Sequence, residues 1–286
     1  MHPATVSALV LALASTVLTQ VAYLRQHDAA AALPVLSMRR PVHSLQLLLH
    51  DRSWMLGFAL EGVGFLLYAA ALSLGPLALV QSVLAGGIGV LAFLTERMGR
   101  RRLGRRERSG ALVAVFGLLL LSVSLIGGSS EGKPGSTAQI LLWLGSSGAV
   151  AVLVFVFGRR LIGQALACAI AGGLAFSVGD IATKVATQGG WRLAFVVPLV
   201  VGYALGTALL QIGYQAGAAL TVAGIATLLT NALPIAAGTV VLDEPVPAGA
   251  YGVLRVAAFV AVVAGAILLA SPAKAPGPTA TTPDPS

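Results

Sequence analysis

The chain has 286 residues, of which 57% are hydrophobic and only 10% are charged, and its formal net charge is +8. Soluble domains average about 25% charged residues, so this composition excludes a soluble globular enzyme as the default class. The single cysteine, Cys168, excludes a disulfide framework and a multi-cysteine zinc site, and a polytopic membrane protein remains.

Apolar segments of about 20 residues, long enough to cross a bilayer, recur along the chain. No Lys or Arg precedes the first segment and Arg25 follows it, which argues against a signal peptide and predicts an outside N-terminus. We predict an all-α protein whose nine transmembrane spans are 4–24, 54–73, 76–95, 109–127, 138–157, 164–187, 192–213, 218–241 and 250–270.

The segment between the first two spans has too short an apolar stretch to cross. Ala29 to Met38 is apolar, but Arg39 and Arg40 follow at once, and each would cost about 2.5–3.5 kcal/mol at a bilayer centre. We interpret residues 25–53 as an interfacial or re-entrant stretch, with a crossing as the alternative.

Basic residues gather in alternate loops and predict the orientation of the chain. Seven arginines lie between Arg97 and Arg108, and Arg159 and Arg160 form a further pair, which places these loops in the cytoplasm. Nine spans then predict a multi-pass protein of the plasma (bacterial inner) membrane with a cytoplasmic C-terminus. The arginine-rich loop lacks interleaved aromatic residues, so we expect it to contact anionic lipids and no nucleic acid. The Pro-rich residues 271–286 predict a disordered cytoplasmic tail.

Two stretches of the chain resemble each other and predict an internal repeat. Residues 11–22 and 173–186 are similar, and each is followed by a span that opens at a tryptophan, Trp54 or Trp191. The predicted spans give the halves, about 4–127 and 164–270, opposite orientations, with 138–157 as a linking span. Inverted repeats are a common plan of secondary transporters, with the substrate site between the repeats. We therefore expect one transmembrane domain that moves a small solute by alternating access.

The stretch from Ala71 through Met98, which reads ALSLGPLALVQ and then LTERM, resembles the drug/metabolite transporter superfamily with its EamA-like repeats. Within that superfamily the chain is most similar to the nine-span NIPA-like branch. The motifs that carry this resemblance are Trp54 to Gly57, Gly62 and Gly64, Gly75-Pro76, Glu96-Arg97, Gln211-Ile212 with Tyr214, and the acidic pair Asp243-Glu244. The resemblance implies transport of magnesium. The chain departs from the branch at Phe65, where an acidic residue is expected, and around Tyr68, where an Asn is expected.

Ionisable groups inside a membrane are costly and are candidates for function. Glu61 lies about 10 Å into its predicted span at 1.5 Å per residue, and Tyr68 is seven residues further on the same helical face. Glu61 is a candidate proton or cation carboxylate and the candidate metal ligand of the chain. The alternative is a glutamate that is hydrogen-bonded between helices.

A second charged pair is predicted in the other half. Asp180 and Lys184 are four residues apart, so they share one helical face with Ser177. They are candidates for a coupling-ion pair, and an internal ion pair with Lys184 reaching the headgroups is the alternative.

The span at 218–241 contains a proline that frees a backbone carbonyl. Pro234 lacks an N–H, so the carbonyl of Thr230 loses its helical partner beside Thr227 and Asn231. This group could coordinate a cation or a substrate hydroxyl, or the kink could simply be satisfied by a neighbouring helix. Neutral hydrogen-bonding side chains complete the candidate substrate pathway, with helix–helix packing as the alternative role of each: Gln81, Gln211 and Tyr214.

No P-loop is present, so we expect an ion gradient of H⁺ or Na⁺, or facilitated flux, with Mg²⁺ as the alternative substrate and no other cofactor. We expect no enzymatic activity, because no nucleophile–base set is visible. A non-transporting membrane scaffold or accessory protein is the competing class. The GxxxG pairs Gly202/Gly206 and Gly213/Gly217 predict close packing within the chain or a homodimer face.

Overall fold

The computed structural model describes residues 3–74, 83–84, 86–98, 102–126, 136–186, 189–241 and 249–270. Every regular element in these ranges is helical, which confirms the all-α class. The helices are α1 (Pro3–Ala32), α2 (Pro41–His50), α3 (Arg52–Leu74), α5 (Gly87–Arg97), α6 (Arg105–Ile126), α7 (Thr137–Leu153), α8 (Arg159–Leu161), α9 (Gln164–Ala186), α10 (Val196–Ala216), α11 (Ala219–Val241) and α12 (Ala250–Ala270). A π-helical turn (Val154–Gly158) joins α7 to α8, and a 3-10 turn (Gly190–Phe195) precedes α10.

Several helices have the length and composition of membrane spans. Among the described residues, those that could cross a bilayer are Val6–Ala32, Thr137–Leu161, Gln164–Thr183, Gly190–Ala216 and Ala250–Leu269, and Ala219–Pro234 is a shorter apolar helix. Their outward faces carry exposed apolar side chains, such as Leu142, which is 73% exposed, and Val253, which is 72% exposed. A surface of this kind suits lipid and not water, so the chain is a polytopic membrane protein.

The described residues of the nine predicted spans lie mainly on these helices, with two differences. Residues 76–82 and 85 of the third predicted span lie outside the described residues, and its later part lies on α5. The first span was predicted to end near residue 24, which is wrong, because α1 continues to Ala32. The alanines at 29–32 favour the helix. At the C-terminal end of α1, Gln215 of α10 donates a hydrogen bond to the carbonyl oxygen of Ala30 and accepts one from the N–H of Leu36, which follows the helix.

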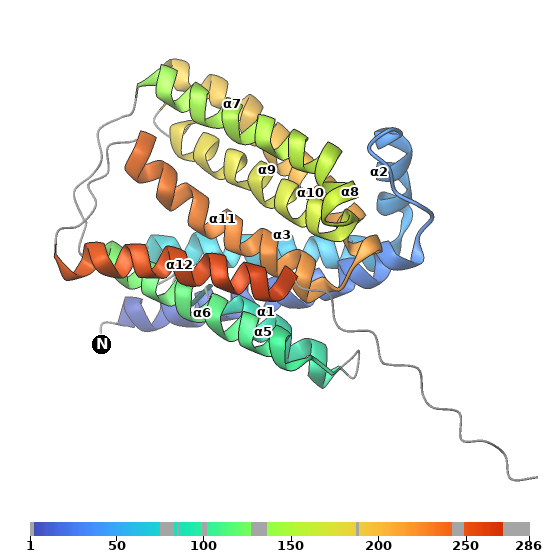
Figure 1. The fold of residues 1–286 in the computed structure, drawn as a ribbon, viewed down its shortest axis with the longest axis horizontal. Coiled ribbons are helices and arrows are strands. Elements are labelled where there is room, and N and C mark those ends of the chain that lie inside the picture. Colours follow the sequence, from blue (N-terminus) through green and yellow to red (C-terminus); the bar gives the residue numbers. More distant parts are fainter. Residues whose placement is uncertain are drawn as a thin grey trace, which may run out of the picture.

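Helix α2 has 10 residues, or about 15 Å at 1.5 Å per residue, which is half of a hydrocarbon core of about 30 Å. It lies at the same end of the bundle as α8 (Figure 1). A helix of this length cannot cross a bilayer, in agreement with the interfacial interpretation of this segment.

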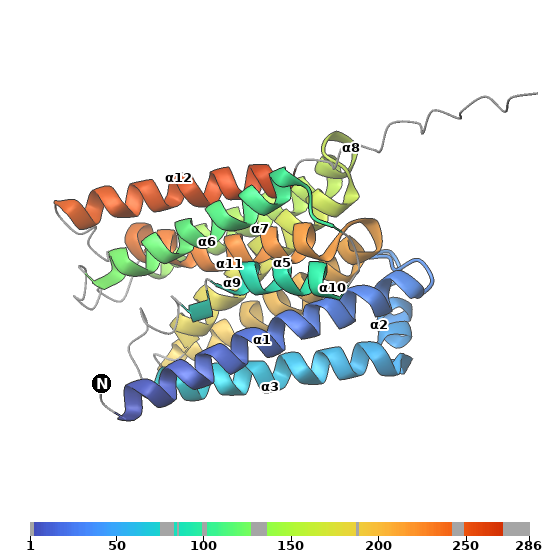
Figure 2. The same cartoon turned by 90° about the horizontal axis from the view of Figure 1, so that it is seen from below.

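The long helices lie along a common direction in both views (Figures 1 and 2). Helix α1 runs toward the end of the bundle that holds α2, and α9 runs away from it, since α8 lies at that same end. The first helices of the two predicted halves therefore have opposite directions.

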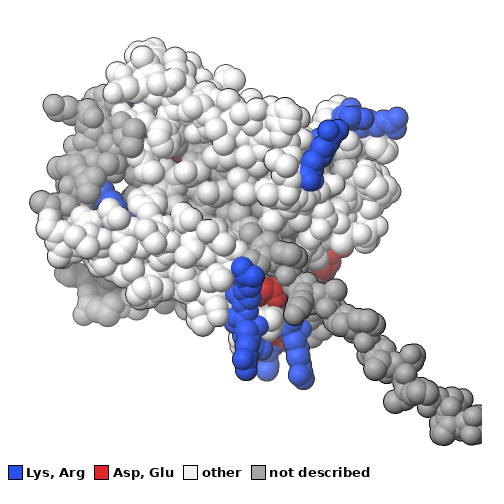
Figure 3. All heavy atoms as spheres, in the orientation of Figure 1, with Lys and Arg blue, Asp and Glu red and all other residues white. Residues whose placement is uncertain are grey.

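The end of the bundle with α2 and α8 is the basic end. Figure 3 shows two groups of Lys and Arg side chains there. The described arginines of this end include Arg39, Arg40, Arg52, Arg97, Arg102, Arg105, Arg106, Arg108, Arg159 and Arg160. The membrane side that this end faces stays a prediction, as do its contact with anionic lipids and the tail 271–286, which lies outside the described residues.

Glycines bring packed helices close together, as in the pair α9 and α10. A Cβ atom at Gly202 of α10 would lie 2.7 Å from the carbonyl oxygen of Ala175, and one at Gly206 would lie 2.7 Å from the ring of Phe176, both on α9. Gly213 likewise faces Cys168, whose side chain is buried. The GxxxG glycines of α10 are thus used within the chain, so they give no support to a homodimer.

Candidate functional site

Three side chains from three helices form a hydrogen-bonded chain inside the bundle. Gln211 of α10 donates its Nε2 amide to Oε1 of Gln26 on α1 at 2.7 Å, and Gln26 donates its own Nε2 to Oε2 of Glu61 on α3 at 2.7 Å. Gln26 and Gln211 are each 1% exposed. This chain links the two predicted halves, because α1 and α3 belong to the first and α10 belongs to the second.

A glycine one helical turn before Glu61 makes this contact possible. A Cβ atom at Gly57 would lie 2.9 Å from Cγ of Gln26 and 3.2 Å from the carbonyl oxygen of Ala22. Gly64, seven residues later, does the same, since a Cβ atom there would lie 2.7 Å from Oγ1 of Thr19. Helices α1 and α3 therefore approach closely along one face, and Glu61 lies between the two glycines.

Two carboxyl groups from different halves share one tyrosine neighbour. Tyr23 of α1 lies within electrostatic reach of Glu61 and of Asp180 on α9. Asp180 accepts a hydrogen bond from the hydroxyl of Tyr203 on α10. Tyr214 also lies within electrostatic reach of Tyr23 and Glu61. Tyr23 is thus within electrostatic reach of Glu61, Tyr214 and Asp180, and a shared substrate pathway stays a prediction.

Two buried polar atoms of α10 have no hydrogen-bond partner among the described residues. They are Oε1 of Gln211 and the hydroxyl oxygen of Tyr214, which lies three residues later on the same helix. Buried polar groups are nearly always hydrogen-bonded, so these two atoms are candidate contacts for a ligand.

Helices α1 and α10, which the hydrogen bond from Gln211 to Gln26 joins inside the bundle, are joined again at the basic end. Gln215 donates Nε2 to the carbonyl oxygens of Ala30 at 2.7 Å and of Leu33 and Pro34 at 3.1 Å, and its Oε1 accepts from the N–H of Leu36 at 2.9 Å. His27 of α1 lies 3.1 Å from the carbonyl oxygen of Gly217. These bonds, which we call the Gln215 latch, hold the end of α1 and the residues after it against α10.

The polar groups near the proline of α11 do not join the network. Asn231 donates Nδ2 to the carbonyl of Thr227, and Thr230 donates its hydroxyl to the carbonyl of Ala226, each at 2.8 Å and within the helix. Pro234 lies inside α11, as the sequence implies. These contacts agree with the alternative interpretation, in which the side chains satisfy their own helix, and they leave a substrate role for this region as a prediction.

The remaining predicted residues are distributed as follows. Tyr68 is half-buried beside the ring of Phe65 and within electrostatic reach of Asp180. Ser177 is buried on α9. Gln81, the side chain of Lys184 and the acidic pair at 243–244 lie outside the described residues, so the Asp180–Lys184 ion pair stays a prediction.

The described residues contain no group of three or more His, Cys, Asp or Glu side chains that could hold a metal ion. Glu61 has an amide, and no second carboxylate, at hydrogen-bonding distance. Its surroundings suit a proton-binding carboxyl group better than a member of a metal cage.

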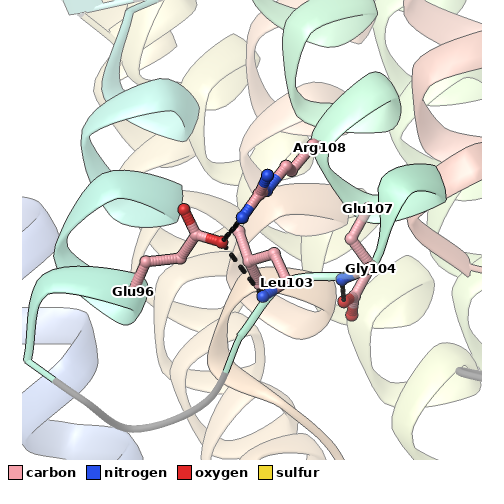
Figure 4. A network of polar contacts seen from close by, with 5 residues as sticks. All are labelled: Glu96, Leu103, Gly104, Glu107 and Arg108. Carbon is pink, nitrogen blue, oxygen red and sulfur yellow. Dashed lines mark hydrogen bonds and ion pairs between the residues drawn. The ribbon is translucent and has the colours of Figure 1, made fainter.

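A separate polar cluster closes the connection between α5 and α6 at the basic end (Figure 4). Oε1 of Glu96 accepts from Nη2 and Nε of Arg108 at 2.7 and 3.0 Å and from the N–H of Leu103 at 3.1 Å. Glu107 accepts from the N–H of Gly104 at 3.0 Å. Arg108 first, and the Leu103 N–H second, hold the pKa of Glu96 below its ordinary value. This cluster orients the basic loop and lies outside the network of Glu61.

Sequence reasoning missed the side chains that connect the predicted ones. Gln26 and Tyr23 fell at or beyond the predicted end of the first span, and Tyr203 and Gln215 were not singled out. The available signal was the run of alanines at 29–32, which extends α1 past Gln26.

No model of a known protein family and no solved structure matches the chain. Its sequence is similar to that of a protein of Arabidopsis thaliana described as "Probable magnesium transporter NIPA9". The two are 24% identical over 284 residues, which cover 91% of this chain and 80% of the relative.

Proposed function

We propose that the protein is a secondary transporter that moves a small solute across the membrane by alternating access, with Mg²⁺ as the first candidate substrate. One observation carries the proposal: the hydrogen-bonded chain of Glu61, Gln26 and Gln211 joins the two halves inside the bundle. Similarity to a probable magnesium transporter along most of the chain supports the choice of solute.

The chemistry of the interior fits a path for a small polar solute. A carboxyl group and two amides inside a membrane bundle are expensive unless they are paired or line a pathway. Glu61 and Asp180 supply negative charge from opposite halves around Tyr23. Mg²⁺ dehydrates reluctantly and keeps several waters, so it would meet these carboxyl groups through its water shell.

The proposal also covers the relationship and the location of the protein. We propose that it belongs to the drug/metabolite transporter superfamily, and that it lies in the plasma membrane with its basic end in the cytoplasm. These parts of the proposal are supported by the opposite directions of α1 and α9 and by the arginines gathered at one end of the bundle.

The test is Mg²⁺ flux into proteoliposomes that enclose a magnesium-sensitive dye, comparing wild type with Glu61→Gln. We expect flux in wild type and a loss of at least about tenfold in the variant, which corresponds to about 1.4 kcal/mol, because the charge of Glu61 is removed from the pathway. Glu96→Gln is the matched control, since it removes a carboxylate at the basic end, and it should retain nearly full flux.

Two results would count against the proposal. Absence of flux in monodisperse, reconstituted wild type would remove magnesium as the solute. Equal flux in wild type and Glu61→Gln would remove Glu61 from the pathway.

A further inference from the structure

The hydrogen bonds from Gln211 to Gln26 to Glu61 have a direction that the charge of Glu61 sets. An ionised carboxylate can only accept hydrogen bonds, so Gln26 must turn its NH₂ group toward Glu61 and its carbonyl oxygen toward Gln211. Gln211 must then use its NH₂ group to bond Gln26, which leaves its own carbonyl oxygen facing away from the chain. The observed contacts have this order.

Protonation of Glu61 makes the reverse order possible, because a neutral carboxyl group can donate a hydrogen bond as well as accept one. The new O–H of Glu61 donates to Oε1 of Gln26 once that amide has rotated by half a turn, and the NH₂ of Gln26 then faces Gln211. Gln211 rotates in the same way, accepts through its carbonyl and presents its NH₂ group outward. One proton enters from solution and no covalent bond in either amide changes. The outward group of Gln211 therefore changes from an acceptor to a donor.

We propose that Glu61, Gln26 and Gln211 form a proton-operated relay that makes Gln211 a binding site for a cation or a hydrogen-bond donor only while Glu61 is ionised. The inference rests on the proposed function, and it names the proton as the coupling ion. The solute and the proton would compete, so the transporter would exchange one for the other.

The unpartnered atoms of α10 are where such a ligand would bind. The relay determines whether Gln211 presents Oε1 or its NH₂ group to a ligand. In the structure Oε1 is presented, and it is buried without a partner among the described residues. The hydroxyl oxygen of Tyr214 is in the same condition three residues along the helix. Both are neutral oxygen ligands, which suit a cation that retains part of its water shell.

The groups around Glu61 leave it as the titrating member of the relay. Among the described residues, the titratable groups within its electrostatic reach are the hydroxyls of Tyr23 on α1 and Tyr214 on α10, and phenols ionise only near pH 10. Asp180 of α9 acts on the same Tyr23. The histidines of α2, which packs on α3, are exposed at the end of the bundle.

The first experiment needs no solute. Side-chain amide NH₂ resonances of Gln26 and Gln211 are followed by NMR in nanodiscs containing the full-length, ¹⁵N-glutamine-labelled protein, with each residue assigned by its substitution. We expect both resonances to shift with pH at one common midpoint. The shift should disappear in Glu61→Gln and persist in Asp180→Asn, a matched removal of the other interior carboxylate. A Gln211 resonance that ignores pH, or one that still titrates in Glu61→Gln, would overturn the relay.

The second experiment adds the solute. Mg²⁺ should lower the common midpoint, and its apparent affinity should fall about tenfold for each pH unit below the midpoint, the limit for one proton competing with one cation. Gln26→Met, which keeps the shape but removes the relay, should abolish this pH dependence. Mg²⁺ affinity that keeps its pH dependence in Gln26→Met would contradict the relay. Absence of Mg²⁺ flux in wild type would contradict only the proposed solute, because the solute-free titration stands independently.

Discussion

Two of the contacts between the halves of the molecule differ in chemical character. Helix α6 of the first half packs on α12 of the second through small residues, whereas α1 of the first half meets α10 of the second through polar side chains. The first contact holds two backbones together and the second holds exchangeable hydrogen bonds.

Glycine and alanine set the distance between α6 and α12. A Cβ atom at Gly117 would lie 2.8 Å from the backbone nitrogen of Val262, and one at Gly110 would lie 2.9 Å from Cβ of Leu268. On the other helix, a Cβ atom at Gly265 would lie 2.8 Å from the nitrogen of Ala114. Such contacts have no alternative arrangement, because any sliding of one helix would bring side chains into backbone.

The contact of α1 with α10 depends on side chains that can change partners. Gln211 bonds Gln26 in the bundle interior, and the Gln215 latch closes the basic end. Amide groups can exchange one partner for another or for water at little cost. If the proposed function holds, the comparison predicts that α6 and α12 stay packed during transport and that α1 and α10 separate.

The largest expected effect comes from breaking the contact of α6 with α12. Gly117→Leu places a side chain where the backbone of α12 lies, and overpacking of this kind costs about 1–3 kcal/mol. We expect a clear fall in the thermal unfolding midpoint in detergent. Gly145→Leu is the matched control, since a Cβ atom there meets nothing within 4 Å, and it should change stability by less than about 0.5 kcal/mol. Equal effects of the two variants would contradict this description of the contact.

An intermediate effect is expected at the Gln215 latch. Gln215→Leu removes the acceptor of the Leu36 N–H and the donor to three carbonyls of α1 and its continuation. Lost hydrogen bonds of about 1–2 kcal/mol correspond to amide exchange of Leu36 that is about 5–30 times faster. Hydrogen exchange with mass spectrometry measures this. Gln46→Leu, on the exposed side of α2, should leave the exchange unchanged, and an unchanged rate in Gln215→Leu would show that the latch does not hold this segment.

The smallest effect is expected at the basic end, which belongs to neither contact. Arg108 and the Leu103 N–H lower the pKa of Glu96, so the cluster is complete above the ordinary glutamate value of about 4.3. Its contribution is lost as the pH falls through the lowered pKa. Hydrogen exchange of the Leu103 amide, corrected for intrinsic rates, should therefore accelerate on acidification in wild type. In Glu96→Leu, which removes the acceptor of the Leu103 N–H, it should be fast at every pH; protection that survives in this variant would contradict the role of Glu96.

Much of the bundle was predictable from local pattern. Spans such as 109–127 and 250–270 coincide with α6 and α12 within a few residues, because an apolar run of this length has no other stable state in a membrane. The glycines were visible too. Whether Gly202 and Gly206 face another helix of this chain or a second copy was not, since a sequence does not give the direction of a helix face.

The candidate site was predictable only in part. Glu61, Gln211 and Tyr214 were found because a polar residue in an apolar run is conspicuous. Gln26 was missed because it fell beyond the predicted end of its span, and its role depends on a bond to a residue 185 positions away. Asp180 was predicted to face Lys184 by helical spacing, which stays a prediction, and its hydrogen bond from Tyr203 on another helix was not foreseen.

The sequence by itself determined the class of this protein, its helices and the basic loops, because these follow from hydrophobicity, length and charge along the chain. The tertiary structure decided which polar groups meet. Close approach of α1 to α3 at Gly57, and of α1 to α10, places Gln26 between Glu61 and Gln211. The reason is physical: a hydrogen bond needs its atoms within about 3 Å, and only helix packing brings distant parts of the chain to that distance.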